Sequence, residues 1–295
     1  MARISNAFKN ITSLRQCYFK ALLGKESLVK IINEAEIPEH VYNSNAIENS
    51  TLSLEETEKI LLEIDLARFV SEREIYEAKN LALVMGYVES KAKTTELSKD
   101  LMLLLHKMLI SNINAEIAGR FRKPTEWVRV GNYIAADPTQ IETLLDLLIT
   151  ELRSNPEETI IKRIARLHLT FEHIHPFCDG NGRIGRVLNN FVLLREDYVP
   201  INIAFTSRAE YYEAFKAFDA RKDTTMMEII VGKALTNSYH KRLAYLEGKK
   251  IITLNEYAKN HKLSHPNLIN KAQRQTIPAF TEKGTWKIDS DFKSS

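Results

Sequence analysis

The densest group of reactive side chains in this sequence lies at residues 175–186, which read His-Pro-Phe-Cys-Asp-Gly-Asn-Gly-Arg-Ile-Gly-Arg. His175 can accept a proton near neutral pH, and Asp179 offers a carboxylate to a hard cation such as Mg²⁺. Arg183 and Arg186 are three residues apart, so on a helix they would share one face and could bind β- and γ-phosphates. Together these groups could hold a nucleoside triphosphate on Mg²⁺ while a hydroxyl group attacks it.

Glycines in the same segment favour phosphate binding by the backbone. Helical patterns lie on both sides, which predicts a loop that leads into the first turn of a helix. A helix N-terminus presents unpaired N–H groups and a partial positive charge, and both attract anions. Gly180 and Gly182 would let this backbone approach an anion without a Cβ in the way. Asn181, between them, could donate a side-chain N–H to the α-phosphate.

A metal-hydrolase site is an alternative for the same residues, with His173, His175 and Asp179 as ligands. A His-x-His pair presents both rings to one side only on a strand, where side chains alternate between faces. The pattern before His175 is helical, and a metal site would leave the Gly-Asn-Gly-Arg run without a role. We therefore favour the phosphate-binding loop with a base beside it.

The elements that must position this loop are predicted to be mainly helical. Apolar residues recur at helical spacing over residues 54–70, 75–90, 97–110, 141–152, 160–174, 208–218 and 225–246. Residues 126–134 differ, because β-favouring side chains flank Gly131-Asn132, which predicts a hairpin.

Composition narrows the class of protein further. With 295 residues, 44% hydrophobic and 27% charged, the chain suits one large globular domain and a small one. A net charge of +3 is too small to imply nucleic-acid or membrane binding by itself. No apolar run approaches the ~20 residues of a membrane span, and the start lacks the apolar core of a signal peptide. Cys17 and Cys178 give no disulfide framework. We expect a cytoplasmic protein without a membrane partner.

Residues 175–186 resemble the signature of the Fic family, His-x-Phe-x-(Asp/Asn)-Gly-Asn-Gly-Arg-x-x-Arg, and match every fixed position. The sequence on either side is also similar, and the resemblance covers roughly residues 40–235. Fic proteins are mostly adenylyltransferases, which move AMP from ATP onto a Ser, Thr or Tyr hydroxyl of another protein. The resemblance implies a mainly α Fic-fold helical bundle, His175 as catalytic base, ATP as co-substrate and Asp179 as a Mg²⁺ ligand.

The resemblance also implies roles outside the signature. In Fic proteins a β-hairpin flap pairs with the target's backbone, which here implies residues 126–134, including Val128 and Val130. Tyr211-Tyr212 stands where the family carries a tyrosine pair near the adenine. Asp219 stands where many members have an Asn that faces the base, and this departure leaves the preference for ATP over other nucleotides open.

A second motif, Ser-Asn-Ala-Ile-Glu-Asn at residues 44–49, matches the family's inhibitory pattern (Ser/Thr)-x-x-x-Glu-(Gly/Asn). Ser44 and Glu48 are four residues apart and so neighbours on one helix face. In the family this Glu pairs with the second arginine of the signature, here Arg186, and ATP then binds unproductively. Because the motif precedes the signature, the chain resembles the subclass with an N-terminal inhibitory helix.

Residues 250–295 are predicted to form a separate small module. Two short helices joined by a turn at residues 262–264 are followed by two short strands, near residues 277–280 and 284–288. The order resembles winged helix-turn-helix modules that bind DNA, and basic residues outnumber acidic ones by a thin margin. DNA contact through residues 250–295 and a docking or structural appendage are both left open.

We therefore expect three parts: residues 1–95 with the inhibitory motif, a Fic core at residues 96–248 and a winged helix-turn-helix-like module at residues 249–295. The predicted function is transfer of AMP from ATP to a hydroxyl of a target protein and of itself, held back by Glu48. Two alternatives stay open. One is transfer of another phosphate-bearing group, and the other is a DNA-binding regulator whose Fic body senses a nucleotide. The sequence leaves a homodimer open as well.

Overall fold

The computed structural model describes residues 2–131, 133–155 and 157–293, with side chains from residue 11 onward in those ranges. The described chain is mainly helical, as predicted, and none of its helices is long and apolar enough to cross a membrane. It divides into two compact units. The first contains Met1–Glu36, Val199–Asn202 and Ile229–Ser295, and the second contains Ile37–Tyr198 and Ile203–Glu228.

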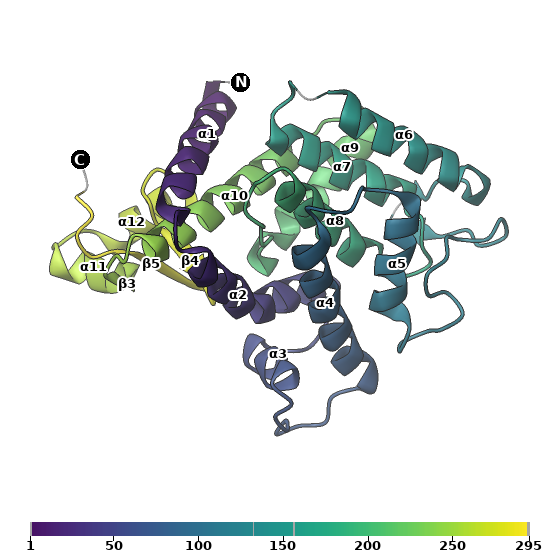
Figure 1. Ribbon diagram of the computed structural model, residues 1–295, viewed down its shortest axis with the longest axis horizontal. Coiled ribbons are helices and arrows are strands. Elements are labelled where there is room, and N and C mark those ends of the chain that lie inside the picture. The colour runs from purple at the N-terminus through teal and green to yellow at the C-terminus, as the bar shows by residue number, and fades with distance from the viewer. Residues whose placement is uncertain (1, 132, 156, 294–295) are drawn as a thin grey trace. The chain divides into compact units, whose positions relative to one another are not determined.

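The second unit is a bundle of helices around one buried helix, α8. Its elements are the end of α2 (Glu26–Ile47), α3 (Leu54–Leu61), α4 (Glu72–Lys91), α5 (Lys99–Ile110), α6 (Ile141–Ser154), α7 (Ile160–Ile174), α8 (Asn181–Arg195) and α9 (Arg208–Arg221). Helix α8 packs against α7, α4 and α5 (Figure 1). Ile184, Leu188 and Phe191 form one apolar face without exposed surface, and because most other residues of α8 are buried too, the helix is enclosed around most of its circumference.

Serine and threonine caps set where several of these helices begin. The Ser53 hydroxyl accepts the backbone N–H of Glu56, and the Glu56 carboxylate accepts the N–H of Ser53, which completes a capping box before α3. Ser71 and Ser98 cap α4 and α5 in the same way, with a hydroxyl that accepts an N–H three residues on.

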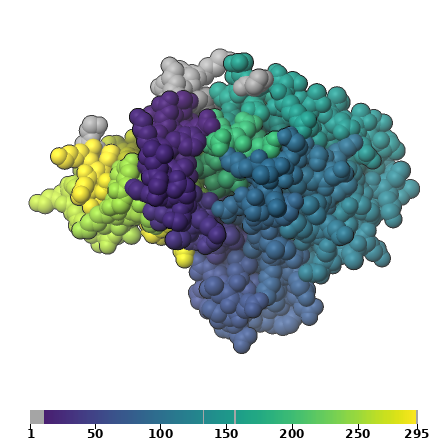
Figure 2. Space-filling view, viewed as in Figure 1, coloured from purple at the N-terminus to yellow at the C-terminus, as the bar shows by residue number. Residues whose placement is uncertain are grey.

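The helix predicted over residues 54–70 is wrong beyond Leu61. Glu63 adopts a left-handed φ of 58°, and the N–H of Ile64 bonds back to the carbonyl of Lys59, which ends the helix. The following loop leaves Ile64 52% and Phe69 90% exposed. Figure 2 shows this segment, in blue-violet, as a lobe at the edge of its unit. Apolar spacing alone therefore overstated the helix.

The predicted hairpin is present, although it is short. Strand β1 (Arg129–Val130) pairs antiparallel with β2 (Tyr133–Ile134), with Arg129 opposite Ile134 and Val130 opposite Tyr133. Gly131 has a φ of 57°, a backbone conformation that the tight turn needs and that glycine adopts without strain. Asn132 lies outside the described residues. A single 3-10 turn, η1 (Pro138–Gln140), then leads into α6.

The first unit contains α1 (Ala2–Leu22), most of α10 (Thr225–Leu246) and the C-terminal module. In the module, β3 (Ile251–Thr253), α11 (Leu254–Asn260), α12 (His265–Gln273), β4 (Phe280–Glu282) and β5 (Thr285–Asp289) surround a small apolar core. The sheet order is β3-β5-β4, antiparallel throughout. Strand β3 was not predicted. Helix α12 exposes amide and basic side chains and has no acidic residue, but DNA contact stays a prediction.

Candidate functional site

The signature segment forms the connection between α7 and α8, and its backbone is bent at two points. His175 ends α7 in a left-handed conformation, with φ 52°, and its N–H bonds to the carbonyl of Phe171 at 2.9 Å. Few non-glycine residues adopt this conformation, and such strain often marks a functional site. Gly180, with φ 80°, caps α8, and a Cβ there would lie 3.2 Å from side-chain atoms of Leu109 and Ile110. The loop therefore depends on a glycine at this position.

The side chain of Asn181 stabilises the loop through two hydrogen bonds to the backbone of Phe177. Its side-chain oxygen accepts the N–H of Phe177 at 2.9 Å, and its Nδ2 donates to the carbonyl of Phe177, also at 2.9 Å. The residue is 2% exposed. In this structure the amide therefore supports the backbone cradle, and its expected contact with a phosphate stays a prediction.

Two buried residues outside the signature hold the signature loop through hydrogen bonds to its backbone carbonyls. The sequence analysis identified neither residue. His106 Nδ1 accepts the N–H of Gly119 at 3.0 Å, so its Nε2 carries the proton and donates to the carbonyl of Asp179 at 3.1 Å. The ring stacks on Phe177 with centroids 3.8 Å apart, and burial lowers the pKa of His106 to about 4. His106 is thus held neutral, in the tautomer that this pair of bonds requires.

Arg122 joins the signature loop to the hairpin. Its guanidinium donates to the carbonyls of His175 at 2.8 Å, Glu126 at 2.9 Å and Ala136 at 2.7 Å. Its backbone N–H bonds to the carbonyl of Pro176 at 2.9 Å. Only 3% of Arg122 is exposed. Because its contacts are all to backbone, no side-chain pattern in the sequence could have revealed this role.

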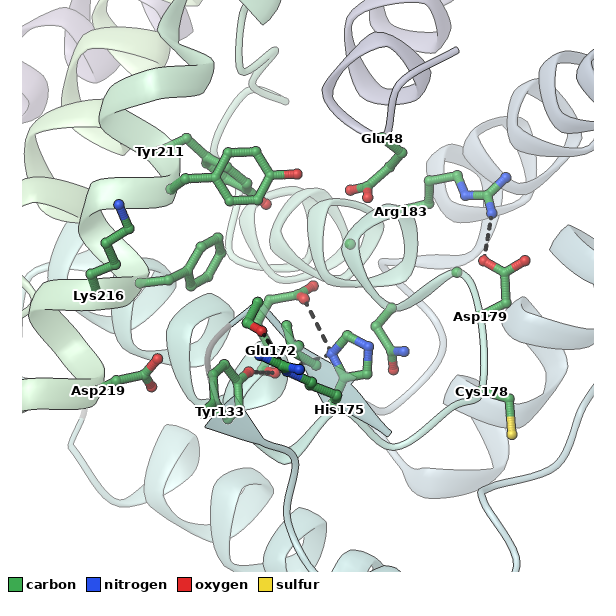
Figure 3. Close-up of a pocket in the computed structure, with 18 of the residues that line it drawn as sticks. Glu48, Tyr133, Glu172, His175, Cys178, Asp179, Arg183, Tyr211, Lys216 and Asp219 are labelled. Carbon is green, nitrogen blue, oxygen red and sulfur yellow. Dashed lines mark hydrogen bonds and ion pairs between the residues drawn. The ribbon is translucent and has the colours of Figure 1, made fainter. Parts of the chain in front are cut away.

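A cavity of about 950 Å³ opens over the start of α8. Figure 3 shows Asp179 and Arg183 on one side of it and Tyr211, Lys216 and Asp219, all on α9, on the other. His175 and Glu172 lie between the two sides, and Glu48 faces them. The volume is in the range of small-molecule sites. One end is therefore charged and next to a helix N-terminus, and the other is partly aromatic.

Asp179 and Arg183 belong to a closed ring of four charges at the first of these ends. Arg183 binds Oδ1 of Asp179 at 3.1 Å, and Arg73 on α4 binds Oδ2 at 2.6 Å. Glu77 completes the ring, 3.1 Å from each of the two arginines. Burial opposes ionisation of Asp179, but Arg183 and Arg73 hold its pKa below the ordinary value. Asp179 is thus an anion at neutral pH. The contact of Arg73 with it was not predicted from the sequence.

His175 lines the cavity as a neutral imidazole. Its Nδ1 lies 3.3 Å from the backbone carbonyl of Glu172, which places the proton on Nδ1 and leaves Nε2 as an acceptor. Burial is the main cause that lowers the pKa of His175 to about 4. Nε2 of His175 could therefore accept a proton at neutral pH, although its affinity for a proton is weak.

Arg186 is buried, and each of its three nitrogens has an acceptor, on the segment that carries the second motif or on α9. Its Nε donates to the Ser44 hydroxyl at 2.8 Å, and its Nη2 to the Ser44 carbonyl at 2.8 Å and to Glu48 Oε1 at 2.9 Å. Nη1 donates to the Tyr211 hydroxyl at 3.0 Å. Burial would lower the pKa of Arg186, but Tyr211 and Glu48 raise it above the ordinary value.

Gly182 provides the space for Glu48. A Cβ at position 182 would lie 2.1 Å from Glu48 Oε1 and 3.2 Å from Arg186 Nη1. The carboxylate of Glu48 therefore lies directly over the first turn of α8, where an anion is favoured.

The α9 end of the cavity is partly closed by hydrogen bonds. Tyr211 is 2% exposed, and its hydroxyl also contacts His168 Nε2 at 2.6 Å. Tyr212 is 39% exposed, and its hydroxyl donates to the carbonyl of Ile47 at 3.2 Å. Asp219 accepts from His173 Nδ1 at 2.8 Å. His173 and His175 thus serve different partners and do not converge on a shared metal position.

The fold and the cavity define a helical protein with a glycine-rich loop at a helix N-terminus and a neutral histidine beside it. Residues 96–193 match the model of the Fic/DOC family. This part of the chain is therefore a Fic/DOC domain.

Individual relatives agree with this assignment. The chain is 30% identical over 207 residues to the Protein adenylyltransferase Fic of Nematostella vectensis, which covers 69% of this chain and 48% of the relative. A Fic domain-containing signalling protein from Bacteroides thetaiotaomicron has the same fold, with TM-score 0.71 and 23% identity over 82% of this chain and 98% of that one. A Fic family protein from Desulfovibrio desulfuricans has TM-score 0.67 and 20% identity, over 98% and 97%. This chain spans about half the length of the curated relatives it matches.

Because burial lowers the pKa values of three histidines, we expect the folded protein to lose stability in mild acid. Burial lowers the pKa to about 4 for His106 and His175 and to about 3 for His168, while an unfolded chain titrates near 6.5. Below pH 6.5 the unfolded chain therefore binds protons that the folded chain does not, and the free energy of unfolding falls toward pH 4. Glu172 acts in the opposite direction, since its folded pKa is raised to about 8, but one group does not offset three.

Urea unfolding between pH 7 and pH 5 measures this effect. At pH 5.5 the three histidines and Glu172 together give a net uptake of about two protons on unfolding. A free energy of unfolding that stays constant or rises over this interval would contradict the assignment of neutral buried imidazoles.

Proposed function

We propose that this protein is a protein adenylyltransferase that moves AMP from ATP to a hydroxyl group of a target protein. One observation carries the proposal: a neutral histidine, the glycine-lined N-terminus of α8 and Arg183 line one cavity. The names of the curated relatives support the same reaction. The target hydroxyl attacks the α-phosphorus, a new P–O bond forms, and pyrophosphate leaves as the bond between the α- and β-phosphates breaks.

The chain's own residues account for the proton and for the phosphates. Nε2 of His175 accepts the proton of the attacking hydroxyl, while the Glu172 carbonyl holds Nδ1. The N–H groups at the start of α8 and the guanidinium of Arg183 oppose the negative charge that moves to the leaving phosphates.

A Mg²⁺ ion fits the donor set at this end of the cavity. Asp179 is an ionised carboxylate, and among the described residues no cluster of three or more His, Cys, Asp or Glu could enclose a metal. Mg²⁺ commonly takes one or two carboxylates and completes its shell with phosphate oxygens and water. When bound, it would neutralise phosphate charge. Asp179 would hold it after release of one of its two arginines, and Arg73, whose side chain is 57% exposed, is the more accessible of these.

The proposal predicts that His175→Ala abolishes transfer while nucleotide binding survives. Loss of the general base should lower the rate by about 10²–10⁴-fold or more. The measurement is incorporation of label from α-³²P-ATP into proteins of a lysate, together with calorimetric ATP affinity. Unchanged labelling by folded His175→Ala would remove the base assignment. Parallel reactions with UTP, GTP and CTP decide whether another nucleotide is preferred, a choice that Asp219 leaves open.

Glu48 is proposed as an internal inhibitor, because its carboxylate occupies the guanidinium of Arg186 and the space above Gly182. A triphosphate and this carboxylate cannot use the same donors at once.

Glu48→Gly should therefore raise labelling from ATP by roughly tenfold or more, since one charge-assisted contact is worth about that much. Glu48→Gly combined with Arg186→Ala should lose the gain, because the gain depends on that guanidinium. Glu63→Gly, which changes an exposed carboxylate in the loop after α3, is the matched control and should leave labelling unchanged. A wild-type protein already as active as Glu48→Gly would contradict inhibition and leave the catalytic proposal intact.

The hairpin is proposed to bind targets by strand addition, which gains affinity from backbone hydrogen bonds and tolerates varied side chains. The N–H of Ala135 bonds to the carbonyl of Val128 at 3.0 Å. In an antiparallel pair the bonding residues alternate, so the N–H of Arg129 faces away from β2 and is available to a target.

Arg129→Pro removes this N–H and should reduce target labelling several-fold with unchanged ATP affinity. Arg129→Ala is the matched control, since it removes the same side chain and keeps the donor. Equal losses in both variants would show that the side chain matters and that the strand edge does not.

A further inference from the structure

A buried carboxylic acid lies directly behind the proposed base. Glu172, in the last turn of α7, is 8% exposed, and its Oε1 is buried without a hydrogen-bond partner. Its Oε2 lies 3.8 Å from Nδ1 of His175, as the dashed line in Figure 3 shows. Gly185 leaves the space for this group, because a Cβ there would lie 2.8 Å from Glu172 Oε1. An unpartnered buried carboxyl is costly, so simple packing does not explain it.

The groups around Glu172 connect it to both halves of the site. From its own helix, His168 also lies next to Gly185, since a Cβ there would be 3.0 Å from His168 Nδ1. From β2, the Tyr133 hydroxyl donates to the backbone carbonyl of Glu172 at 3.0 Å. Arg186 on α8 favours its ionised form, and Glu48 at the end of α2 opposes that form. Tyr211 on α9 is bonded to Arg186 and adds no positive charge.

The charge of Glu172 therefore depends on where the Glu48 carboxylate lies. Burial is the main cause that raises the pKa of Glu172 to about 8, Glu48 raises it further, and Arg186 lowers it. With Glu48 in place, Glu172 and His175 are both uncharged at neutral pH, and the 3.8 Å contact joins two neutral groups. Withdrawal of Glu48 would remove one negative charge and release Arg186, and both changes favour the carboxylate of Glu172.

We propose that Glu172 is a positioning residue for His175, and that Glu48 restrains the base through Glu172 as well as the nucleotide through Arg186. As a carboxylate, Glu172 stabilises the imidazolium that forms when Nε2 of His175 takes the proton of the attacking hydroxyl. As a neutral acid it does not, and His175 stays a weak base. This inference rests on the proposed transfer reaction only for its kinetic part.

The ionisation of Glu172 is tested without any transfer reaction. Infrared spectra recorded against pH on the nucleotide-free protein of 295 residues report the protonated carboxyl band, and the band lost in Glu172→Gln assigns it. We expect a midpoint near 8 in the wild type and a midpoint about one pH unit lower in Glu48→Gly. The same midpoint in both proteins would overturn the coupling to Glu48, even if transfer is never observed.

The pH profile of transfer tests the positioning role. In Glu48→Gly the rate should rise with pH along a limb whose midpoint equals that of the Glu172 band. Glu48→Gly with Glu172→Gln should lack this limb and be about tenfold slower at pH 8, with the ATP affinity unchanged. Glu142→Gln, on an exposed face of α6, is the matched control and should keep the limb. Glu172→Met, which fills the site without a polar group, should match Glu172→Gln.

A structural role alone predicts a different set of results. Glu172→Gln and Glu172→Met would then unfold more easily, while any folded protein would keep the pH limb and its midpoint. Retention of the limb in either folded variant would overturn the positioning role.

Discussion

The buried guanidinium of Arg186 is the interaction on which the site depends. A guanidinium stays charged at any physiological pH, so it must have acceptors when it is buried. Ser44 provides two, Tyr211 one and Glu48 one, from α2 and α9, which are far apart in the sequence. The need for acceptors at this one charge therefore holds the end of α2 against the start of α8, and it places the Glu48 carboxylate in the cavity.

Much of the site follows from the sequence because its chemistry is local. The glycines, Asp179 and the arginines at positions 183 and 186 lie within one helix start, and the spacing of a helix start fixes which of them point the same way. The bounds of α7 could be predicted as well, since its apolar periodicity agrees with its ends. Residues 54–70 show the limit of this approach, because a left-handed residue at position 63 ended the helix while the apolar spacing continued.

The supporting residues could not be predicted for two different reasons. Arg122 and His106 act through backbone carbonyls and N–H groups, which every residue possesses, so no pairing of residue types signals them. Arg73 and Glu77 lie one helical turn apart on α4 and form an ion pair with each other, which is a pattern typical of solvated helix faces. The pair becomes part of the site only because α4 packs beside α8, which brings Arg73 to Asp179 and Glu77 to Arg183. Glu172 was passed over similarly, as one acid among the charges of an amphipathic helix.

The overlap between Glu48 and the space above Gly182 has a consequence for how the site responds to concentration. The carboxylate is part of the chain, so it faces the α8 N-terminus at an effective concentration on the order of millimolar or higher. Under the proposed inhibition, a soluble anion would have to displace this tethered competitor, and the apparent affinity of that anion would fall by the fraction of time that Glu48 is in place. A partner that draws the end of α2 away by a few ångströms would alter this fraction without contacting the cavity. The start of α8 would thus be occupied by an anion in either state, and the stability of the end of α2 would set the sensitivity of the site to its ligand.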